Sequence, residues 1–338
     1  MLNTSVKDLA EKIRSKDISA LELTQFYIDR IEKHNGLINA VIAERFDRAL
    51  SDARLADKMV RADASLGPLH GIPMTIKDAY EVTGLTCDVG HLPYKGRVST
   101  QDAVVVQRLR AAGAIILGKT NTPLLCADLQ TYNAIHGTTN NPHDLAHTPG
   151  GSSGGAAAAL ASGMTPFEFG SDIGGSIRTP AHFCGVFGHK STFGVIPQSG
   201  HVPPVHGART GSALNVVGPL ARTVTDLELA FNVTVGLDER VGSGLRLALP
   251  RCKIRSPRSL RVGLWLGDDY CPVDAELLRG IERAARVLES EGAIVEEAKP
   301  DFSLAEHHET YLMHLAPIIA AGFGPKEIDI MQSVVSTT

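Results

Sequence analysis

Short apolar segments that alternate with helical segments, from Gly71 onward, constrain the fold of this chain most strongly. The apolar segments cover residues 72–76, 114–117 and 165–169, and their lengths are typical of buried strands. Residues 102–112, between two of them, have the apolar spacing of a helix. Strands that alternate with helices indicate βαβ units. The sequence therefore predicts an α/β fold.

Further elements are expected on both sides of this region. Near the N-terminus, Ser19 and Glu22 have the spacing of a capping box at the start of a helix. A helix before it would place four apolar residues on one face: Val6, Leu9, Ala10 and Ile13. The other expected elements are helices over residues 44–61, 225–235, 274–291 and 304–323, and strands over residues 260–265 and 293–297.

The charge balance argues against polyanionic partners. The 338 residues include 33 Lys and Arg and 37 Asp and Glu, for a net charge of −4. The chain thus lacks the basic field that gathers nucleic acid or an acidic membrane surface. The N-terminus has no apolar signal segment, and the apolar stretch over residues 315–324 is short and interrupted by Pro317. We therefore expect a soluble, cytoplasmic protein with neither nucleic acid nor a membrane as partner.

Neither a disulfide framework nor a metal site is expected. The five cysteines are widely separated and include no C-x-x-C pair: Cys87, Cys126, Cys184, Cys252 and Cys271. His143 and His147 are four residues apart, but Pro142 and Pro149 bracket them. A helix that would present both imidazoles on one face is therefore not expected, and two ligands alone are too few for a catalytic zinc site.

Residues 113–120 fit the phosphate-loop pattern G-x-x-x-x-G-K-[ST]. A phosphate-binding loop needs a turning backbone that is followed at once by a helix. Here the middle of the pattern is Ala-Ile-Ile-Leu, which favours a strand, and Pro123 follows where the helix would begin. The segment is therefore predicted to be a strand, and nucleotide binding is not expected.

Two glycine- and serine-rich segments carry the strongest functional signal. The first, residues 150–155, opens directly into the alanine-rich residues 156–161, which favour a helix. Ser152 and Ser153 are therefore expected at a helix N-terminus, beside unpaired backbone N–H groups. A serine at this place can also serve only as the helix cap, and the sequence leaves that alternative open.

The second segment, residues 170–178, follows an expected strand and precedes an expected short helix. Its glycine turn can bring successive backbone N–H groups toward one point, because glycine permits the φ values that such an arrangement requires. An oxyanion hole has this geometry. A plain glycine turn is the alternative.

A serine nucleophile needs a base, and Lys77 is the candidate. It ends the apolar segment 72–76, where burial would favour the neutral amine. Serine–lysine pairs are an established variant of the hydroxyl-plus-base arrangement. Taken alone, Lys77 is also compatible with an ordinary surface charge.

Three segments, in this order, resemble the motifs of the amidase signature family: residues 76–78, 150–155 and 174–178. The similarity continues through residues 179–190 and 194–197 and covers the chain from about residue 5 to about residue 323. The resemblance implies a mixed central β-sheet covered by helices on both faces.

The resemblance also implies one domain with three parts. These are an N-terminal helical segment (1–65), a catalytic core (66–235) and a C-terminal part (236–338) that is short for the family. Family members use their C-terminal part to complete the sheet and to line the substrate channel. We therefore expect a substrate pocket that is open, degenerate or completed by a partner subunit.

By position, the resemblance makes Ser176 the nucleophile, Ser152 a bridging serine that follows a cis peptide bond, and Lys77 the base. The implied oxyanion hole consists of the backbone N–H groups of Ile173, Gly174 and Gly175. Residues expected to support the loop are Ser153, Asp172 and Arg178, and residues expected to line the pocket are Cys126, Gly151 and His182.

These expectations describe an amide hydrolase that cleaves the C–N bond of small linear carboxamides, not peptide bonds, through an acyl-enzyme and without a metal or an organic cofactor. Residues 185–204 resemble stand-alone bacterial amidases more than amidotransferase subunits. An amidotransferase A-type subunit stays open as an alternative, as does a non-catalytic homologue that acts as a binding protein. The oligomeric state, monomer or homodimer, also stays open.

Overall fold

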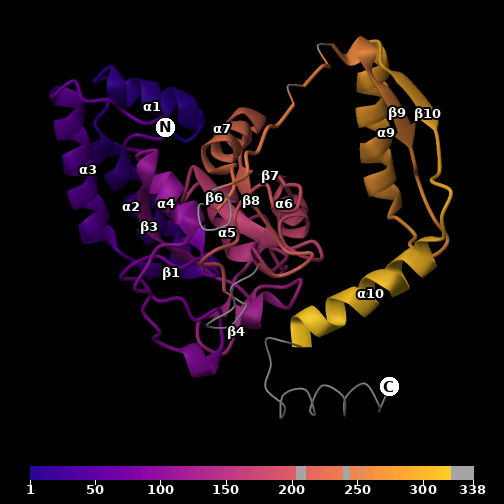
Figure 1. The fold of residues 1–338 in the computed structure, drawn as a ribbon, viewed down its shortest axis with the longest axis horizontal. Coiled ribbons are helices and arrows are strands. Elements are labelled where there is room, and N and C mark those ends of the chain that lie inside the picture. The colour runs from indigo at the N-terminus through magenta and orange to yellow at the C-terminus, as the bar shows by residue number, and fades with distance from the viewer. Residues whose placement is uncertain (203–210, 239–243, 251, 255, 321–338) are drawn as a thin grey trace. The chain divides into compact units, whose positions relative to one another are not determined.

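The computed structural model describes residues 1–202, 211–238, 244–250, 252–254 and 256–320 (Figure 1). The described residues up to Leu247 form one compact unit, and those from Ala248 to Ala320 form another. The expected single domain, with internal boundaries after residues 65 and 235, stays a prediction.

Three helices begin the first unit: α1 (Val6–Arg14), α2 (Ala20–Ile38) and α3 (Phe46–Arg61). The four apolar residues predicted for one face of α1 are all buried. The predicted capping box of Ser19 and Glu22 is present at the start of α2. Helix α3 begins later than expected, because Val41–Glu44 forms a strand, β1, that the sequence analysis missed.

The first sheet has the strand order β1-β3-β2, with β2 over Pro73–Lys77 and β3 over Ile115–Thr120. Strands β2 and β3 are parallel, and β1 is antiparallel to β3. Every residue of β2 and β3 is buried, as in sheets that are covered on both faces. Helix α4 (Val104–Ala111) precedes β3. The phosphate-loop pattern thus lies on a buried strand, which confirms the prediction and rules out a phosphate-binding loop there.

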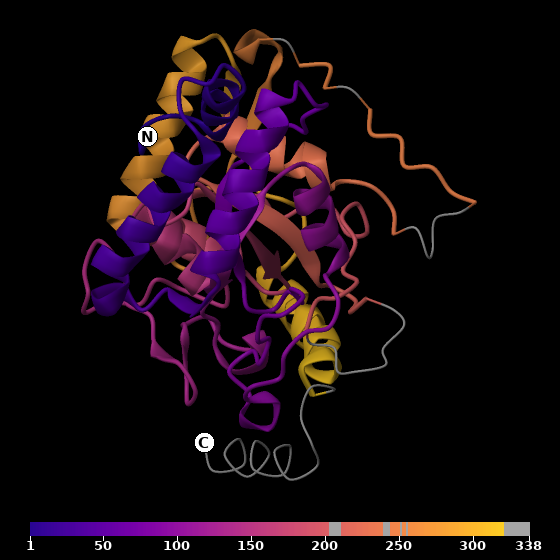
Figure 2. The same ribbon diagram turned by 90° about the vertical axis from the view of Figure 1, so that its left-hand side faces the viewer.

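The second sheet is antiparallel and has the strand order β6-β8-β7. Its strands are β6 (Phe167–Asp172), β7 (Phe187–Gly188) and β8 (Val216–Ala221). The helices of this region are α5 (Gly154–Ala161), α6 (Arg178–Cys184) and α7 (Val224–Thr234). Figure 2 shows the N-terminal helices, in indigo and purple, in front of the strands of this unit. The remaining short elements are η1 (Leu92–Tyr94), η2 (Leu124–Cys126), β4 (Tyr132–Asn133) and β5 (Gly137–Thr138).

The two sheets meet at their edge strands, β2 and β6. Among the described residues, no ladder of backbone hydrogen bonds joins these two strands. Side chains join them instead: Thr75 Oγ1 donates to Glu168 Oε1 (2.6 Å), and Lys77 Nζ contacts Ser171 Oγ (3.0 Å). The expected mixed α/β architecture is present, but its central sheet is divided into two hydrogen-bonded parts.

The second unit is a βαβ arrangement. Strands β9 (Arg261–Leu264) and β10 (Ile294–Glu297) are parallel, and α9 (Ala275–Ser290) connects them. A short helix, η3 (Pro257–Ser259), precedes β9, and α10 (Leu304–Ala320) follows β10. The predicted elements are confirmed here, although the last three residues of the expected final helix lie outside the described residues. Among the described helices, none has the length and apolar content needed to cross a lipid bilayer.

Candidate active site

Lys77 ends β2 and is completely buried. Its Nζ lies within hydrogen-bonding distance of three serine hydroxyls: Ser152 Oγ at 2.7 Å, Ser153 Oγ at 3.0 Å and Ser171 Oγ at 3.0 Å. These serines come from the segment before α5 and from β6. The structure therefore brings together residues that are 75 to 94 positions apart in the chain.

The surroundings of Lys77 favour its neutral amine. Burial lowers the pKa of Lys77, while Cys126, Asp172 and Glu168 act in the opposite direction. Within the part of the chain that the structure describes, no carboxylate forms an ion pair with its Nζ. A neutral amine beside a hydroxyl can accept the proton of that hydroxyl, which is what a general base requires.

The segment before α5 brings two serine hydroxyls to Lys77. The predicted cis peptide bond between Gly151 and Ser152 is present. Ser153 occupies the N-cap position of α5, but its side chain makes no capping hydrogen bond and contacts Lys77 instead. The alternative that Ser153 only caps the helix is therefore wrong. Gly151 is buried, and a Cβ there would lie 2.6 Å from the Gln130 carbonyl oxygen, so close packing requires glycine.

Ser176 lies in the turn between β6 and α6 and is half-buried. The Ser153 N–H donates to the Ser176 carbonyl at 3.1 Å, which places Ser176 next to Ser152 along the neighbouring segment. Between the described side chains of Ser152 and Ser176 there is no hydrogen bond. The structure thus joins Lys77 to Ser152 directly and holds Ser176 beside them through its backbone.

Asp172 and Arg178 brace this turn. Arg178 donates two hydrogen bonds to the Asp172 carboxylate, at 2.7 and 3.0 Å. The same carboxylate accepts the N–H groups of Gly175 (2.8 Å) and Ile177 (3.0 Å). Although burial favours the neutral acid, the hydrogen bonds from Arg178 and from the backbone hold the pKa of Asp172 below its usual range.

The expected oxyanion donors, the N–H groups of Ile173, Gly174 and Gly175, stay a prediction, and one of them already has an acceptor. The Gly175 N–H points to Asp172 Oδ1 and is therefore occupied. Ile173 is half-buried and Gly174 is exposed at the tip of the turn. Among the described residues, the N–H groups of Gly174 and Ser176 have no acceptor. The N–H groups of Gly174 and Ser176 are thus free to donate, and an oxyanion site requires free donors of this kind.

Cys126 lies close to Lys77 and Ser152, whereas His182 lies on the exposed face of α6. Cys126 is half-buried in η2, has a left-handed backbone (φ 58°) and interacts with the hydroxyls of Thr122 and Ser152. Burial raises the pKa of its thiol, so the thiol is neutral near pH 7. His182 is exposed on α6 and packs against Phe183.

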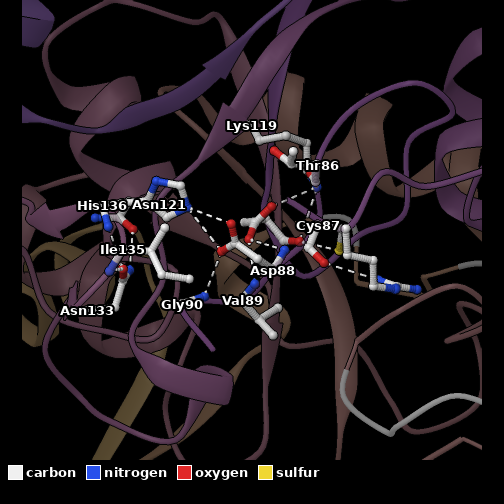
Figure 3. Close-up of polar contacts among 12 residues, drawn as sticks. Thr86, Cys87, Asp88, Val89, Gly90, Lys119, Asn121, Asn133, Ile135 and His136 are labelled. Atoms are coloured by element: carbon white, nitrogen blue, oxygen red, sulfur yellow. Dashed lines mark hydrogen bonds and ion pairs between the residues drawn. The ribbon is translucent and has the colours of Figure 1, made fainter. Parts of the chain in front are cut away.

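A second buried lysine, Lys119, lies near the end of β3, opposite Ile76 of β2 (Figure 3). Its Nζ contacts the Asp78 carboxylate at 3.1 Å and the Tyr80 carbonyl at 2.6 Å. Asp78 also accepts the Val89 N–H at 2.7 Å, and the Val89 carbonyl accepts the Leu125 N–H at 2.8 Å. The ion pair therefore fixes the segment that carries Cys126.

The sequence analysis missed Ser171, Glu168 and the Lys119–Asp78 pair. The available signal for Lys119 was its place inside an apolar strand, because a charge there needs a buried partner. Asp78 directly follows Lys77 but its partner is 41 residues away, so the sequence alone did not reveal the pair.

A protein-family model described as Amidase matches residues 22–323. Among curated proteins, Fatty-acid amide hydrolase 2-A of Danio rerio is 41% identical over 234 residues, which cover 67% of this chain and 44% of that protein. The A subunit of glutamyl-tRNA(Gln) amidotransferase from Carboxydothermus hydrogenoformans is 36% identical over 296 residues, which cover 87% of this chain and 60% of that protein. The chain spans about half the length of the curated relatives it matches.

Solved structures of amide-cleaving enzymes are also similar to this chain. A bacterial aryl acylamidase of the amidase signature enzymes superimposes with a TM-score of 0.82 at 30% identity, covering 94% of this chain and 66% of that one. The 6-aminohexanoate cyclic dimer hydrolase, in complex with substrate, has a TM-score of 0.78 at 32% identity, covering 89% of this chain and 61% of that one.

Proposed function

This chain belongs to the amidase signature family, and from that membership we propose that it hydrolyses the C–N bond of small carboxamides. The observation that carries the proposal is the buried Nζ of Lys77, 2.7 Å from the Ser152 hydroxyl and without a carboxylate partner among the described residues. A lysine in this environment can serve as a base near neutral pH.

In the proposed acylation step, the Ser176 hydroxyl oxygen attacks the amide carbon. Its proton passes to Ser152, and the Ser152 proton passes to Lys77 Nζ. The backbone hydrogen bond between Ser153 and Ser176 supports this relay, because it keeps Ser176 beside Ser152. The negative charge on the carbonyl oxygen is taken up by the free N–H groups of Gly174 and Ser176. The proton then returns from Lys77 through Ser152 to the leaving nitrogen, the C–N bond breaks, and an acyl-Ser176 ester remains.

Deacylation follows the same route with water. Water gives a proton through Ser152 to Lys77 while its oxygen attacks the ester carbon. The returning proton restores the Ser176 hydroxyl as the acid leaves. Both steps use only side-chain hydroxyls, one amine and backbone N–H groups. We therefore propose that the enzyme needs no metal or organic cofactor and acts on a small molecule rather than on nucleic acid.

The experiment that tests this function combines a probe with a substrate screen. A fluorophosphonate should label the folded protein, and Ser176→Ala should abolish labelling. A screen of short aliphatic, aromatic and amino-acid amides should then give ammonia release that is absent in Ser176→Ala. A folded wild-type protein that is neither labelled nor active would instead support the non-catalytic homologue.

An amidotransferase component is the second candidate, because several relatives that are A subunits of glutamyl-tRNA(Gln) amidotransferase match 86–91% of this chain. Such a component would release ammonia from glutamine in preference to simple amides and would depend on partner subunits. Hydrolysis of simple amides by the isolated chain favours the stand-alone amidase.

A further inference from the structure

Ser171 carries a buried hydroxyl on β6 that the proposed mechanism does not use. Its Oγ lies 3.0 Å from Lys77 Nζ, and both side chains are shielded from water. Together with Ser152 and Ser153, it surrounds Nζ with three hydroxyl groups. The proposed relay passes its proton through only the nearest of the three, Ser152, at 2.7 Å.

The partners of the two buried lysines differ in one chemical respect. Lys119 Nζ contacts a carboxylate and three backbone carbonyls, which belong to Asp78, Tyr80 and Thr86. These oxygens can only accept hydrogen bonds, so they suit an ammonium ion that keeps its three protons. A serine hydroxyl can either donate or accept. The hydroxyls around Lys77 can therefore serve Nζ both as an amine and as an ammonium ion, and a base passes through both forms.

The direction of the hydrogen bonds decides whether Lys77 can act as a base. A neutral amine has two N–H groups and one lone pair, so two of the three hydroxyl oxygens must accept if the third O–H is to meet the lone pair. The Ser153 hydroxyl donates to the Ser171 carbonyl at 3.4 Å, so its oxygen is left to accept from Nζ. With Ser171 Oγ as the second acceptor, the lone pair faces the Ser152 O–H.

The same three oxygens also fit Nζ after it has taken up a proton. The ammonium ion has three N–H donors, and each of the three hydroxyl oxygens can accept one of them. Hydrogen bonds from a charged donor are stronger than those from a neutral one. Ser171 therefore stabilises the charge that develops on Lys77 during the relay more than it stabilises the starting amine, and this is the kind of interaction that speeds a reaction.

The other groups that act on the charge of Lys77 are titratable side chains of neighbouring elements: Cys126 in η2, and Glu168 and Asp172 on β6. Helix α5, which packs against β2, has no titratable side chain. Lys119, on the neighbouring strand β3, is paired with Asp78. A substitution at Ser171 changes none of these groups, so its effect on Lys77 can be measured separately.

We propose that Ser171 is a positioning residue that accepts one N–H of Lys77 and thereby directs the lone pair of the amine to the Ser152 hydroxyl. The inference rests on the proposed function. Ser171 acts through Lys77, and its own proton is not passed on. No bond to Ser171 forms or breaks in either half of the reaction.

A pair of substitutions of the same shape isolates the hydroxyl. Ser171→Thr keeps it and Ser171→Val replaces it with a methyl group, and both β-branched residues suit a strand. At a pH where Lys77 is fully neutral, Ser171→Thr should be labelled by a fluorophosphonate at a rate close to that of wild type. Ser171→Val should be labelled about 10–10²-fold more slowly, because the lone pair is no longer held toward Ser152.

The same substitution should also move the acidic limb of the pH–rate profile. Without the Ser171 hydroxyl, the ammonium form of Lys77 loses a strong hydrogen bond and the amine loses a weaker one. Lys77 in Ser171→Val should therefore release its proton at lower pH, and the midpoint should fall by roughly 0.5–1 pH unit.

The test measures the rate of Ser176 labelling by a fluorophosphonate as a function of pH, with Ser176→Ala as the blank. Thr234→Val is the matched control, because it removes an equally buried hydroxyl, which donates to the Ala230 carbonyl within α7 at 2.9 Å. It should leave both the rate and the midpoint unchanged. Thermal unfolding confirms that each labelled protein is folded. If neither Ser171→Thr nor Ser171→Val folds, Ser171→Ala is compared with wild type by the same two measurements.

Slow labelling and an acid-shifted limb in Ser171→Val, with both restored in Ser171→Thr, support the positioning role. Equal rates in these two variants overturn the inference while leaving the proposed function intact. So does slow labelling of Ser171→Val with an unmoved limb, because a purely structural loss would act in that way. A folded wild-type protein that is not labelled at all overturns the proposed function and the inference together.

Discussion

At the scale of single residues, the partner of a buried lysine affects its charge, because Lys77 and Lys119 are equally buried but have different partners. Lys77 is surrounded by three hydroxyls, whereas Lys119, equally buried, contacts a carboxylate. The first environment favours a neutral amine and the second an ammonium ion. We therefore expect these two lysines, on neighbouring strands of one sheet, to differ in charge, and only a neutral lysine can act as a base.

Glu168→Gln should change how the stability of the protein depends on pH. Burial raises the folded-state pKa of Glu168 to about 8, above its usual value of 4.5, so the folded protein holds a proton that the unfolded chain releases. Stability from this group is present at low pH and is lost as pH rises through this window. Relative to wild type, the Gln variant should gain on the order of 1.4 kcal/mol for each pH unit.

Urea unfolding of both proteins near pH 5 and near pH 8 measures this difference. A free energy difference between the two proteins that is the same at both pH values would show that Glu168 is ionised in the folded protein throughout. Glu228→Gln, which makes the same change at an exposed position of α7, should show no such change with pH.

At the scale of elements, the turn between β6 and α6 depends on one glycine. Gly175 has φ 126°, and a Cβ there would lie 2.7 Å from Thr179 Oγ1. Gly175→Ala should therefore strain the turn, lower the free energy of unfolding by about 1–3 kcal/mol and slow the labelling of Ser176. Thermal unfolding and labelling rates check both effects.

A matched glycine in the same unit provides the control. Gly36 lies inside α2, and a Cβ there would meet no atom within 4 Å. Gly36→Ala should raise the free energy of unfolding by about 0.4–1 kcal/mol and leave labelling unchanged. A Gly175→Ala protein as stable and as reactive as Gly36→Ala would contradict the role given to the turn.

The pair of Lys119 and Asp78 should hold β3 to the end of β2. Lys119→Met would leave the Asp78 carboxylate buried without its countercharge, which typically costs about 3–5 kcal/mol. Arg48→Met breaks the ion pair with Asp52 on the surface of α3 and should cost less than about 1 kcal/mol. Urea unfolding measures the free energy of unfolding of both variants. An equal decrease in the two would contradict the importance of the buried pair.

At the scale of the whole molecule, local patterns predicted the elements well and their contacts poorly. The α1 face, the α2 capping box and the strand nature of residues 115–120 followed from periodicity and capping chemistry. Strand β1 was missed because its four residues lie between two strong helices, and its partner β3 is far along the chain.

In the candidate site as well, local segments were predicted and long-range contacts were not. Family motifs indicated Lys77, Ser152 and Ser176, because those residues stand in recognisable local segments. The Glu168–Thr75 contact spans 93 residues and depends on which strands become neighbours, which no local pattern specifies. The hydrogen bond from Gly175 to Asp172 depends on side-chain geometry within the turn. Sequence therefore indicated the reacting groups better than the contacts that hold them.

Site mapping of the fluorophosphonate adduct tests the central claim most directly, since the claim is that buried Lys77 activates Ser176 through Ser152. Wild type and Lys77→Met are labelled at one pH and digested, and the modified residue is identified by mass spectrometry. Lys58→Met, at an exposed position of α3, serves as the control. We expect the adduct on Ser176 in wild type and in Lys58→Met, with labelling of Lys77→Met slower by about 10²–10⁴-fold. An adduct on another residue, or an undiminished rate in folded Lys77→Met, would contradict the account.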